Sequence, residues 1–138
     1  MIVEWGMKFY YLLLFFILSC LAVSSHAQTF SQEEQVHIDS LFEITQTSSS
    51  HDTSRASAYV GLSEVLYVVN IDTIIPLCSA AQEIAELNLQ LQLNKDEKAS
   101  FSKSLGAAYN NIGYVYDEKG DYESALEYYN LALELHKF

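Results

Sequence analysis

The chain has 138 residues, and its 18 acidic side chains against 7 basic ones give a net charge of -11 at pH 7. This length suits one modest domain and argues against a large multidomain enzyme. Half of the residues are hydrophobic, Pro occurs once and Gly five times. That composition excludes a disordered chain and disfavours turn-rich β-structure, so an all-α fold is predicted. The acidic charge disfavours nucleic acids and anionic membrane surfaces as partners.

The N-terminal segment is apolar and uncharged over residues 9–23, directly after Lys8. As a helix these residues would reach about 22 Å at about 1.5 Å per residue, short of the roughly 30 Å hydrocarbon core of a membrane. A positive residue, an apolar run of this length and a Ser-x-Ala step ending at Ala27 are typical of a secretory signal peptide. We therefore expect residues 1–27 to be a signal peptide and the mature protein to be exported, periplasmic or extracellular.

Two alternatives for this N-terminal segment stay open. Residues 17–20 read Ile-Leu-Ser-Cys, which resembles a lipobox and would make Cys20 a lipidated N-terminus. The apolar run would otherwise be kept as an uncleaved membrane anchor. Cleavage after Ala27 removes Glu4 together with Lys8, so the net charge of -11 belongs to the mature chain.

The first helix of the mature chain is predicted to begin after Ser31, which forms a capping box with Glu34. Apolar residues then recur at steps of three and four, which predicts a helix to about Thr45. The residues of this face are Ile38, Leu41, Phe42 and Thr45. The polar residues 46–51 end the helix because their side chains compete for backbone hydrogen bonds. Residues 28–52 are therefore interpreted as an N-terminal capping helix with a linker.

Residues 53–93 are predicted to form a helix, a turn at residues 70–72 and a second helix, with Asp52 as the cap of the first. The cluster of β-branched residues at 65–75 would suit a strand, but the helical period continues on both sides of the turn. The stripe comprises Ala56, Tyr59, Leu62, Ser63, Leu66 and Val69, then Ile74, Leu77, Cys78, Ala81, Ile84 and Ala85. Pro76 is tolerated there if it lies in the first turn, where amides lack intrahelical partners. A break at residues 94–96 follows.

The most specific pattern lies between Ser104 and Leu135. One face of a first helix holds Tyr109, Ile112, Gly113 and Tyr116, and one face of a second holds Ala125, Tyr129 and Ala132, widened by Leu126, Leu133 and Leu135. Gly120 suits the left-handed residue that ends a helix, and Asp121 is placed to cap the next one. Small residues on both faces predict a close approach of two antiparallel helices, with tyrosines filling the space between them.

These residues resemble the tetratricopeptide repeat, a helix-turn-helix unit of about 34 residues. The matching positions are Tyr109, Ile112, Gly113, Tyr116, Gly120, Asp121, Tyr122, Ala125, Tyr129 and Ala132. Lys137 stands where the family usually has a proline that ends the second helix. The resemblance implies a clear repeat over residues 106–138.

An earlier, degenerate copy of this repeat is predicted at residues 53–93. Leu62 and Ser63 correspond to Ile112 and Gly113, and Leu66 corresponds to Tyr116. Ile74, Cys78 and Ala81 correspond to Ala125, Tyr129 and Ala132. Ala81 and Ala132 are further apart than one repeat, which implies lengthened helices and an extra turn around residues 94–102. The predicted fold is thus a short solenoid of stacked antiparallel hairpins over residues 53–138.

The resemblance implies a non-catalytic protein–protein interaction module. Repeats of this family bind peptide segments in the concave groove that their first helices line, which here gives Ala107, Asn110, Tyr114, Asp117 and Glu118 as groove positions. None of these is Lys or Arg, so the family's carboxylate-clamp variant, which grips chaperone C-termini, is not expected. Asp117 and Glu118 favour a neutral or basic segment as the partner.

The C-terminal face of the array is expected to need a neighbour, because each hairpin buries its apolar face only by stacking and about three repeats are usually required. A further repeat, a second copy of the protein or another partner would satisfy it. A signal peptide, a short capping helix and divergent repeats also resemble the sensor regions of bacterial histidine kinases and regulators. This resemblance implies an alternative function, the N-terminal sensory portion of a longer signalling protein such as a histidine kinase or a transcriptional regulator.

Catalysis finds little support in the sequence. His37, His51 and His136 have no ligand-like spacing, so no metal is expected, and no phosphate-binding loop or nucleophile elbow occurs. Cys78 is the one thiol left after removal of residues 1–27, and no His lies near it in sequence. It is expected to be a small core residue rather than a nucleophile. We expect neither enzymatic activity nor a cofactor.

Overall fold

The computed structural model describes residues 30–47 and 49–135, and within these ranges every regular element is a helix. The elements are α2 (Gln32–Gln46), α3 (Asp52–Leu66), the short 3-10 helix η1 (Ile71–Thr73), α4 (Ile74–Leu89), α5 (Lys95–Glu118) and α6 (Tyr122–Leu135). The predicted all-α fold is confirmed. The signal peptide, the lipidation of Cys20, the membrane anchor and the expectations for His136 and Lys137 concern residues outside the described ranges. No helix in the described part of the chain is both long and apolar enough to span a membrane.

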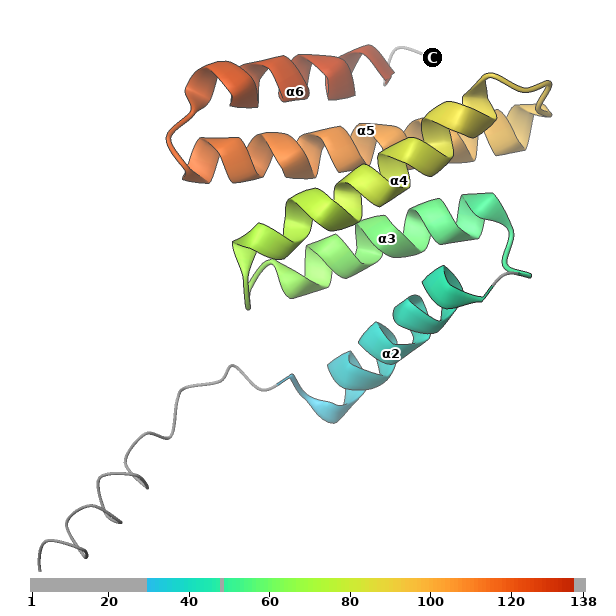
Figure 1. Ribbon diagram of the computed structural model, residues 1–138, viewed down its shortest axis with the longest axis horizontal. Coiled ribbons are helices and arrows are strands. Elements are labelled where there is room, and N and C mark those ends of the chain that lie inside the picture. Colours follow the sequence, from blue (N-terminus) through green and yellow to red (C-terminus); the bar gives the residue numbers. More distant parts are fainter. Residues whose placement is uncertain (1–29, 48, 136–138) are drawn as a thin grey trace, which may run out of the picture.

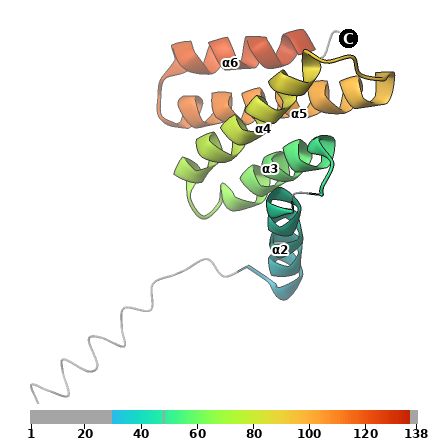
Figure 2. The same ribbon diagram turned by 45° about the vertical axis from the view of Figure 1, so that its right-hand side comes forward.

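The helices stack in chain order, each against the one before it (Figure 1). Two antiparallel hairpins, α3 with α4 and α5 with α6, form the body of the array, and α5 also packs on α3. Figure 2 shows α2 inclined to α3 at the end of the stack that lies opposite α6. The arrangement is the predicted stack of hairpins, with α2 paired to α3.

The hydrophobic core consists of two clusters that share the same three helices. One cluster holds Val60, Ile74, Cys78, Ala81, Ala108, Ile112 and Val115, and the other holds Ala56, Ala85, Phe101 and Leu105. Each cluster draws residues from α3, α4 and α5, so burial of apolar surface binds these helices to one another at two levels.

The start of α2 agrees with the sequence. Ser31 Oγ accepts from the Glu34 amide at 3.2 Å, and the Glu34 carboxylate accepts from the Ser31 amide at 2.7 Å. The latter bond is the main reason why the pKa of Glu34 lies below its usual value. Phe42 departs from the prediction, because it is 57% exposed while Thr45 is buried. The face of α2 that meets α3 is centred on Leu41, which packs beside Gly61.

The N-cap of α3 lies one residue before the predicted position. His51 is the N-cap and its Nδ1 accepts from the Thr53 amide at 3.4 Å, whereas Asp52 is the first helical residue. At the other end α3 stops at Leu66, so Val69 lies beyond the helix and is 53% exposed. The predicted turn at residues 70–72 begins with Asn70, whose side chain accepts from the Asp72 amide at 2.9 Å.

α4 and α5 each begin as their sequences allow. Pro76 is the third residue of α4 and therefore lies in its first turn, as expected. Asn94 caps α5 by accepting from the amides of Asp96 and Glu97, and Glu97 accepts in return from the Asn94 amide at 3.1 Å. The predicted extra turn at residues 94–102 is wrong, because α5 is continuous for 24 residues. Phe101 continues its buried face toward the N-terminus.

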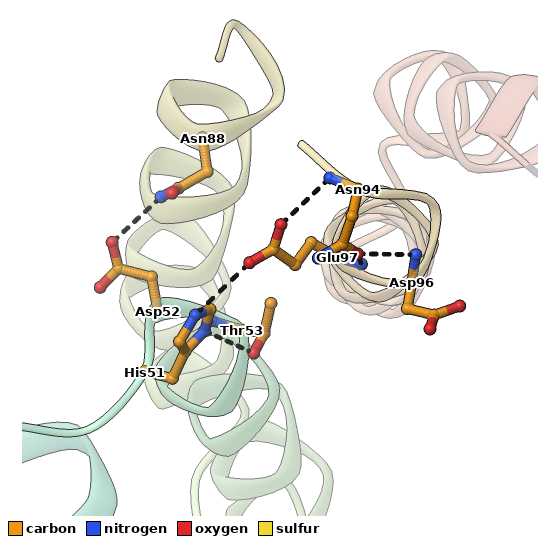
Figure 3. A network of polar contacts seen from close by, with 7 residues as sticks. All are labelled: His51, Asp52, Thr53, Asn88, Asn94, Asp96 and Glu97. Carbon is orange, nitrogen blue, oxygen red and sulfur yellow. Dashed lines mark hydrogen bonds and ion pairs between the residues drawn. The ribbon is translucent and has the colours of Figure 1, made fainter. Parts of the chain in front are cut away.

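Polar contacts tie the starts of α3 and α5 to the end of α4 (Figure 3). His51 Nε2 lies 3.6 Å from Glu97 Oε1, and Asn88 Nδ2 donates to Asp52 Oδ2 at 3.1 Å. Exposed pairs of this kind contribute at most about 1 kcal/mol each. Their effect is to fix the relative positions of three helices whose apolar faces already hold them together.

Candidate functional site

The hairpin of α5 and α6 is closed by an unusually short approach between the two helices. A Cβ added at Gly113 would lie 2.8 Å from Tyr129 Cε1 and 3.2 Å from the Ala125 carbonyl oxygen. Glycine is therefore needed there because any side chain would meet an aromatic ring and a backbone atom. This contact sets the position of α6, and so of every side chain that α6 presents beside α5.

The turn between α5 and α6 depends on the backbone conformation of Gly120 and on the capping bonds of Asp121. Gly120 has a φ of 78°, in the left-handed region that glycine adopts without strain. Asp121 then caps α6, since its carboxylate accepts from the Ser124 hydroxyl at 2.7 Å and from the Ser124 amide at 3.2 Å. These two bonds hold the pKa of Asp121 below its ordinary value. Tyr122, the first residue of α6, is 71% exposed.

Tyrosines of α5 and α6 fill the space between these two helices. The rings of Tyr116 and Tyr128 stack at 5.5 Å, and Tyr109 and Tyr128 lie 6.1 Å apart. Tyr109 also donates its hydroxyl to Glu86 on α4 at 2.8 Å, and burial, with that carboxylate, raises the pKa of its phenol. These three tyrosines are packing residues.

A groove runs across the inner face of the array as three hollows that adjoin at Glu64. The central hollow, about 330 Å³, lies between α3 and α5 and is lined by Ser63, Glu64, Tyr67, Ile74, Asn111 and Tyr114. The hollow beside α2 is lined by Phe30, Glu33, Glu34, His37, Glu64, Val65, Tyr67 and Val68. The hollow beside α6 is lined by Glu64, Lys103, Ala107, Asn110, Asn111, Tyr129, Asn130, Ala132 and Leu133.

The structure places the predicted groove residues in two groups. Ala107 and Asn110 line the hollow beside α6, and Tyr114 lines the central hollow. Asp117 and Glu118 line none of these three hollows and lie at the C-terminal end of α5. Burial raises the pKa of Tyr114, and the nearby charge of Glu118 adds to the shift.

The expectation that the groove holds no Lys or Arg is wrong, because Lys103 lines the hollow beside α6. The error follows from the helix boundary. A repeat that starts at Gly106 leaves Lys103 out, but α5 begins at Lys95, so its groove face includes Lys103, one turn before Ala107. Stepping back four residues from Ala107 would have found Lys103. In the central hollow, Glu64, Tyr67 and Asn111 were also missed.

A buried hydroxyl joins the three inner helices below the central hollow. Ser63 Oγ donates its proton to the Val60 carbonyl at 2.7 Å, accepts from Asn111 Nδ2 at 3.0 Å and accepts from Cys78 Sγ at 3.3 Å. Burial raises the pKa of the Cys78 thiol, so the thiolate that a nucleophile requires is disfavoured. No group of residues in the described ranges is arranged to hold a metal ion.

α6 carries exposed leucines that no other described helix covers. Leu126 is 61% exposed, and Leu133, which also borders the hollow beside α6, is 57% exposed. The preceding α4, in contrast, is packed by α3 and by α5. Within the described residues, nothing occupies the position on α6 that α5 takes on α4.

Comparison with known proteins bears on this C-terminal hairpin. Residues 106–137 match the family model of the tetratricopeptide repeat. The match covers the second half of α5 and all of α6, and the degenerate copy at residues 53–93 stays a prediction. No curated protein and no solved structure matches the chain. The chain therefore carries a tetratricopeptide repeat, a unit that serves protein–protein interaction.

Proposed function

We propose that the inner groove binds an extended segment of a partner protein and that the protein acts without catalysis. The observation that carries the proposal is that three hollows share the lining residue Glu64 and together reach from α2 across α3 and α5 to α6. A peptide laid along them would bury side chains at successive positions. The tetratricopeptide repeat at residues 106–137 supports the same mode of action.

The charges along the groove favour a particular distribution of charge in the partner. Glu33, Glu34 and Glu64 line the hollow beside α2, whereas Lys103 lines the hollow beside α6. Complementary potentials select partners and speed association. The preferred segment is neutral or basic where it crosses α2 and α3, and free of basic residues where it meets Lys103.

The test is to select binders from a displayed library of random peptides of about 12 residues, a length that suits an extended ligand in such a groove. The full chain is used, purified in a mild non-ionic detergent. Asn110→Arg fills the hollow beside α6, and we expect it to weaken the selected peptides about tenfold or more, or about 1.4 kcal/mol. Ser79→Arg places the same side chain on an exposed position of α4 that lines none of the three hollows. Equal effects of the two variants would overturn the proposal.

We further propose that the protein is exported. The support is the sequence of residues 1–27, with Lys8, the apolar run at 9–23 and the small residues that end at Ala27. Expression in a Gram-negative host followed by mass spectrometry of the intact product checks this. A chain that begins at Gln28 is expected. A lipid on Cys20 or an unprocessed chain in the membrane would replace this proposal with the lipoprotein or the anchored form.

The bare face of α6 supports a second candidate, in which the chain is the sensory portion of a longer signalling protein. Leu126 and Leu133 are exposed where a following helix would pack. Reading the gene beyond codon 138 tests this candidate, and an in-frame continuation with further repeats is expected. Light scattering of the purified chain gives the contrasting outcome, since a dimer dissociated by Leu126→Lys would assign the face to self-association.

A further inference from the structure

The central hollow offers hydrogen-bond acceptors to an occupant. The hydroxyl proton of Ser63 is used by the Val60 carbonyl, so Ser63 can only accept from Asn111. This fixes the Asn111 amide with its nitrogen toward Ser63, which leaves its carbonyl oxygen as the acceptor that Asn111 presents on the other side. The Glu64 carboxylate, at the mouth of the same hollow, accepts as well.

The walls of the hollow suit a cation with an apolar stem. The rings of Tyr67 and Tyr114 meet edge to face, with centroids 6.2 Å apart and planes at 90°, and buried Ile74 contributes to the lining. A tyrosine face attracts a guanidinium or ammonium group within about 6 Å of its centroid. None of the residues that line this hollow is itself a cation.

Among the residues that the structure describes, Glu64 is the one charged residue that lines the central hollow, although Lys103 lines the hollow beside α6 together with it. Glu64 forms no ion pair within the described residues, whose ion pairs are those of His51, Arg55 and Lys119. The charge of Glu64 contributes to the raised pKa of Cys78, after burial, so its field reaches the buried polar cluster. Glu118 adds a second carboxylate near the Tyr114 hydroxyl.

We propose that the central hollow binds an arginine side chain of the partner's peptide, packed against the tyrosine pair of Tyr67 and Tyr114 and paired with Glu64. The inference rests on the proposed function, since it names the chemistry that the groove recognises. Arginine fits better than lysine because its planar guanidinium stacks on aromatic rings and has several donors for both acceptors. Its methylene stem would lie along the buried side chain of Ile74.

Other occupants fit less well. An apolar side chain would bury the Asn111 carbonyl and part of the Glu64 carboxylate without partners, and a buried polar group that lacks a partner weakens binding. An acidic side chain would face Glu64 and Glu118 and be repelled by both. An arginine satisfies the acceptors and the charge together.

The experiment uses peptides selected from the random library described above and compares each with its citrulline analogue. Citrulline keeps the shape of arginine and lacks its charge. We expect one arginine position in the selected peptides whose replacement by citrulline weakens binding about tenfold or more. Glu64→Gln should weaken the arginine peptide to a similar degree and the citrulline peptide little. Glu83→Gln, an exposed position of α4 that lines none of the three hollows, is the charge-matched control and should leave both affinities unchanged.

The outcomes separate this inference from the function on which it rests. One outcome is that the selected peptides bind more weakly to Asn110→Arg but keep their affinity when citrulline replaces arginine at every position. This outcome would overturn the arginine site and leave the proposal of a peptide groove intact. The arginine site would also be overturned if Glu64→Gln and Glu83→Gln weakened the arginine peptide equally, because the charge effect would then be general. A library that yields no peptide sensitive to Asn110→Arg would overturn the groove itself, and the arginine site with it.

Discussion

The two hairpins solve the same packing problem with different residues. Where α5 and α6 cross, Gly113 has no side chain and the ring of Tyr129 lies against its backbone. At the corresponding place in α3 and α4, Ser63 has a side chain, and the residue opposite it is the small Cys78, whose sulfur lies 3.3 Å from the Ser63 hydroxyl. A larger residue on one helix is matched by a smaller one on its partner, so both hairpins pack closely with different residues.

The polar link in the first hairpin has no counterpart in the second. Ser63 also accepts from Asn111, which ties α3 to the first helix of the following hairpin. Gly113 has no side-chain atom that can do this. The first hairpin therefore fixes its neighbour with a specific hydrogen bond, while the second presents an apolar outer face.

The largest expected effect tests whether the two hairpins contribute equally to the free energy of unfolding. Leu62 and Ile112 correspond in the predicted repeats, and both are buried. Leu62→Ala and Ile112→Ala should each lower the free energy of unfolding by about 3 kcal/mol, because each removes a buried side chain and leaves a cavity. Urea unfolding followed by circular dichroism measures both.

Leu91→Ala is the matched control for these core substitutions, since Leu91 is exposed between α4 and α5 and should change stability by less than about 0.5 kcal/mol. A loss confined to Ile112→Ala would show that the first hairpin contributes little to the fold, and the correspondence between the hairpins would fail.

A smaller effect is expected where the second hairpin depends on glycine. Gly113→Ala should destabilise the protein by about 1–2 kcal/mol, because overpacking against Tyr129 outweighs the gain of about 1 kcal/mol in helix propensity. Gly61→Ala is the control: its Cβ would meet the end of the flexible Leu41 side chain at 3.2 Å. Thermal unfolding should show a lower midpoint for Gly113→Ala only. Equal midpoints for the two variants would mean that Tyr129 moves aside freely.

The hydrogen bonds of Ser63 in the first hairpin should contribute less to the free energy of unfolding than the packing at Gly113. Ser63→Ala leaves Asn111 and Cys78 without their acceptor and should cost about 1 kcal/mol. In a double-mutant cycle with Asn111→Ala, the two losses should fall short of additivity by about 0.5–1 kcal/mol, since both remove the same bond. Ser79→Ala, at an exposed site on α4, should be neutral. Strict additivity would show that the hydrogen bond does not contribute.

The smallest effect concerns the helix starts, where α6 is capped by Asp121, whereas Thr73, the N-cap of α4, makes no side-chain cap bond. Bonds from the Ser124 hydroxyl and amide hold the pKa of Asp121 below its ordinary value. A lowered folded-state pKa means that the stabilisation is present above about pH 4 and is lost as the pH falls through the folded-state value. Asp121→Asn should flatten this part of the acid limb in melts at different pH, and Ser124→Ala should reduce it. An unchanged acid limb in both variants would contradict the assignment.

Local features of the fold were readable in the sequence, because a cap involves neighbouring residues. The capping box of Ser31 and the turn at Gly120 are such features, and Asn94 with Glu97 forms another that also marks the true start of α5. Phe42 and Val69 were misplaced for a different reason. Periodicity identifies a helix face but not which edge of that face meets the neighbour, which depends on the packing angle and on where the helix stops.

The site divides in the same way. Asn110 and Tyr114 were implied by the resemblance to the repeat family, and Lys103 would have followed from a step of four residues back along α5. The central hollow could not be predicted from positions along one helix, because Ser63 and Asn111 are 48 residues apart in the sequence. They meet only because α3 packs on α5. The arginine site is therefore a property of the assembled array rather than of either repeat.

α5 has a consequence for any attempt to divide the molecule. α5 contributes Phe101 and Leu105 to one core cluster and Ala108, Ile112 and Val115 to the other. Removal of α5 would therefore expose both clusters to solvent. Cleavage in the connection at residues 90–94 would release fragments with bare cores instead of two folded repeats. The smallest excised piece that retains the central hollow runs from α3 through α5, and it ends in the middle of the family's repeat rather than at its boundary.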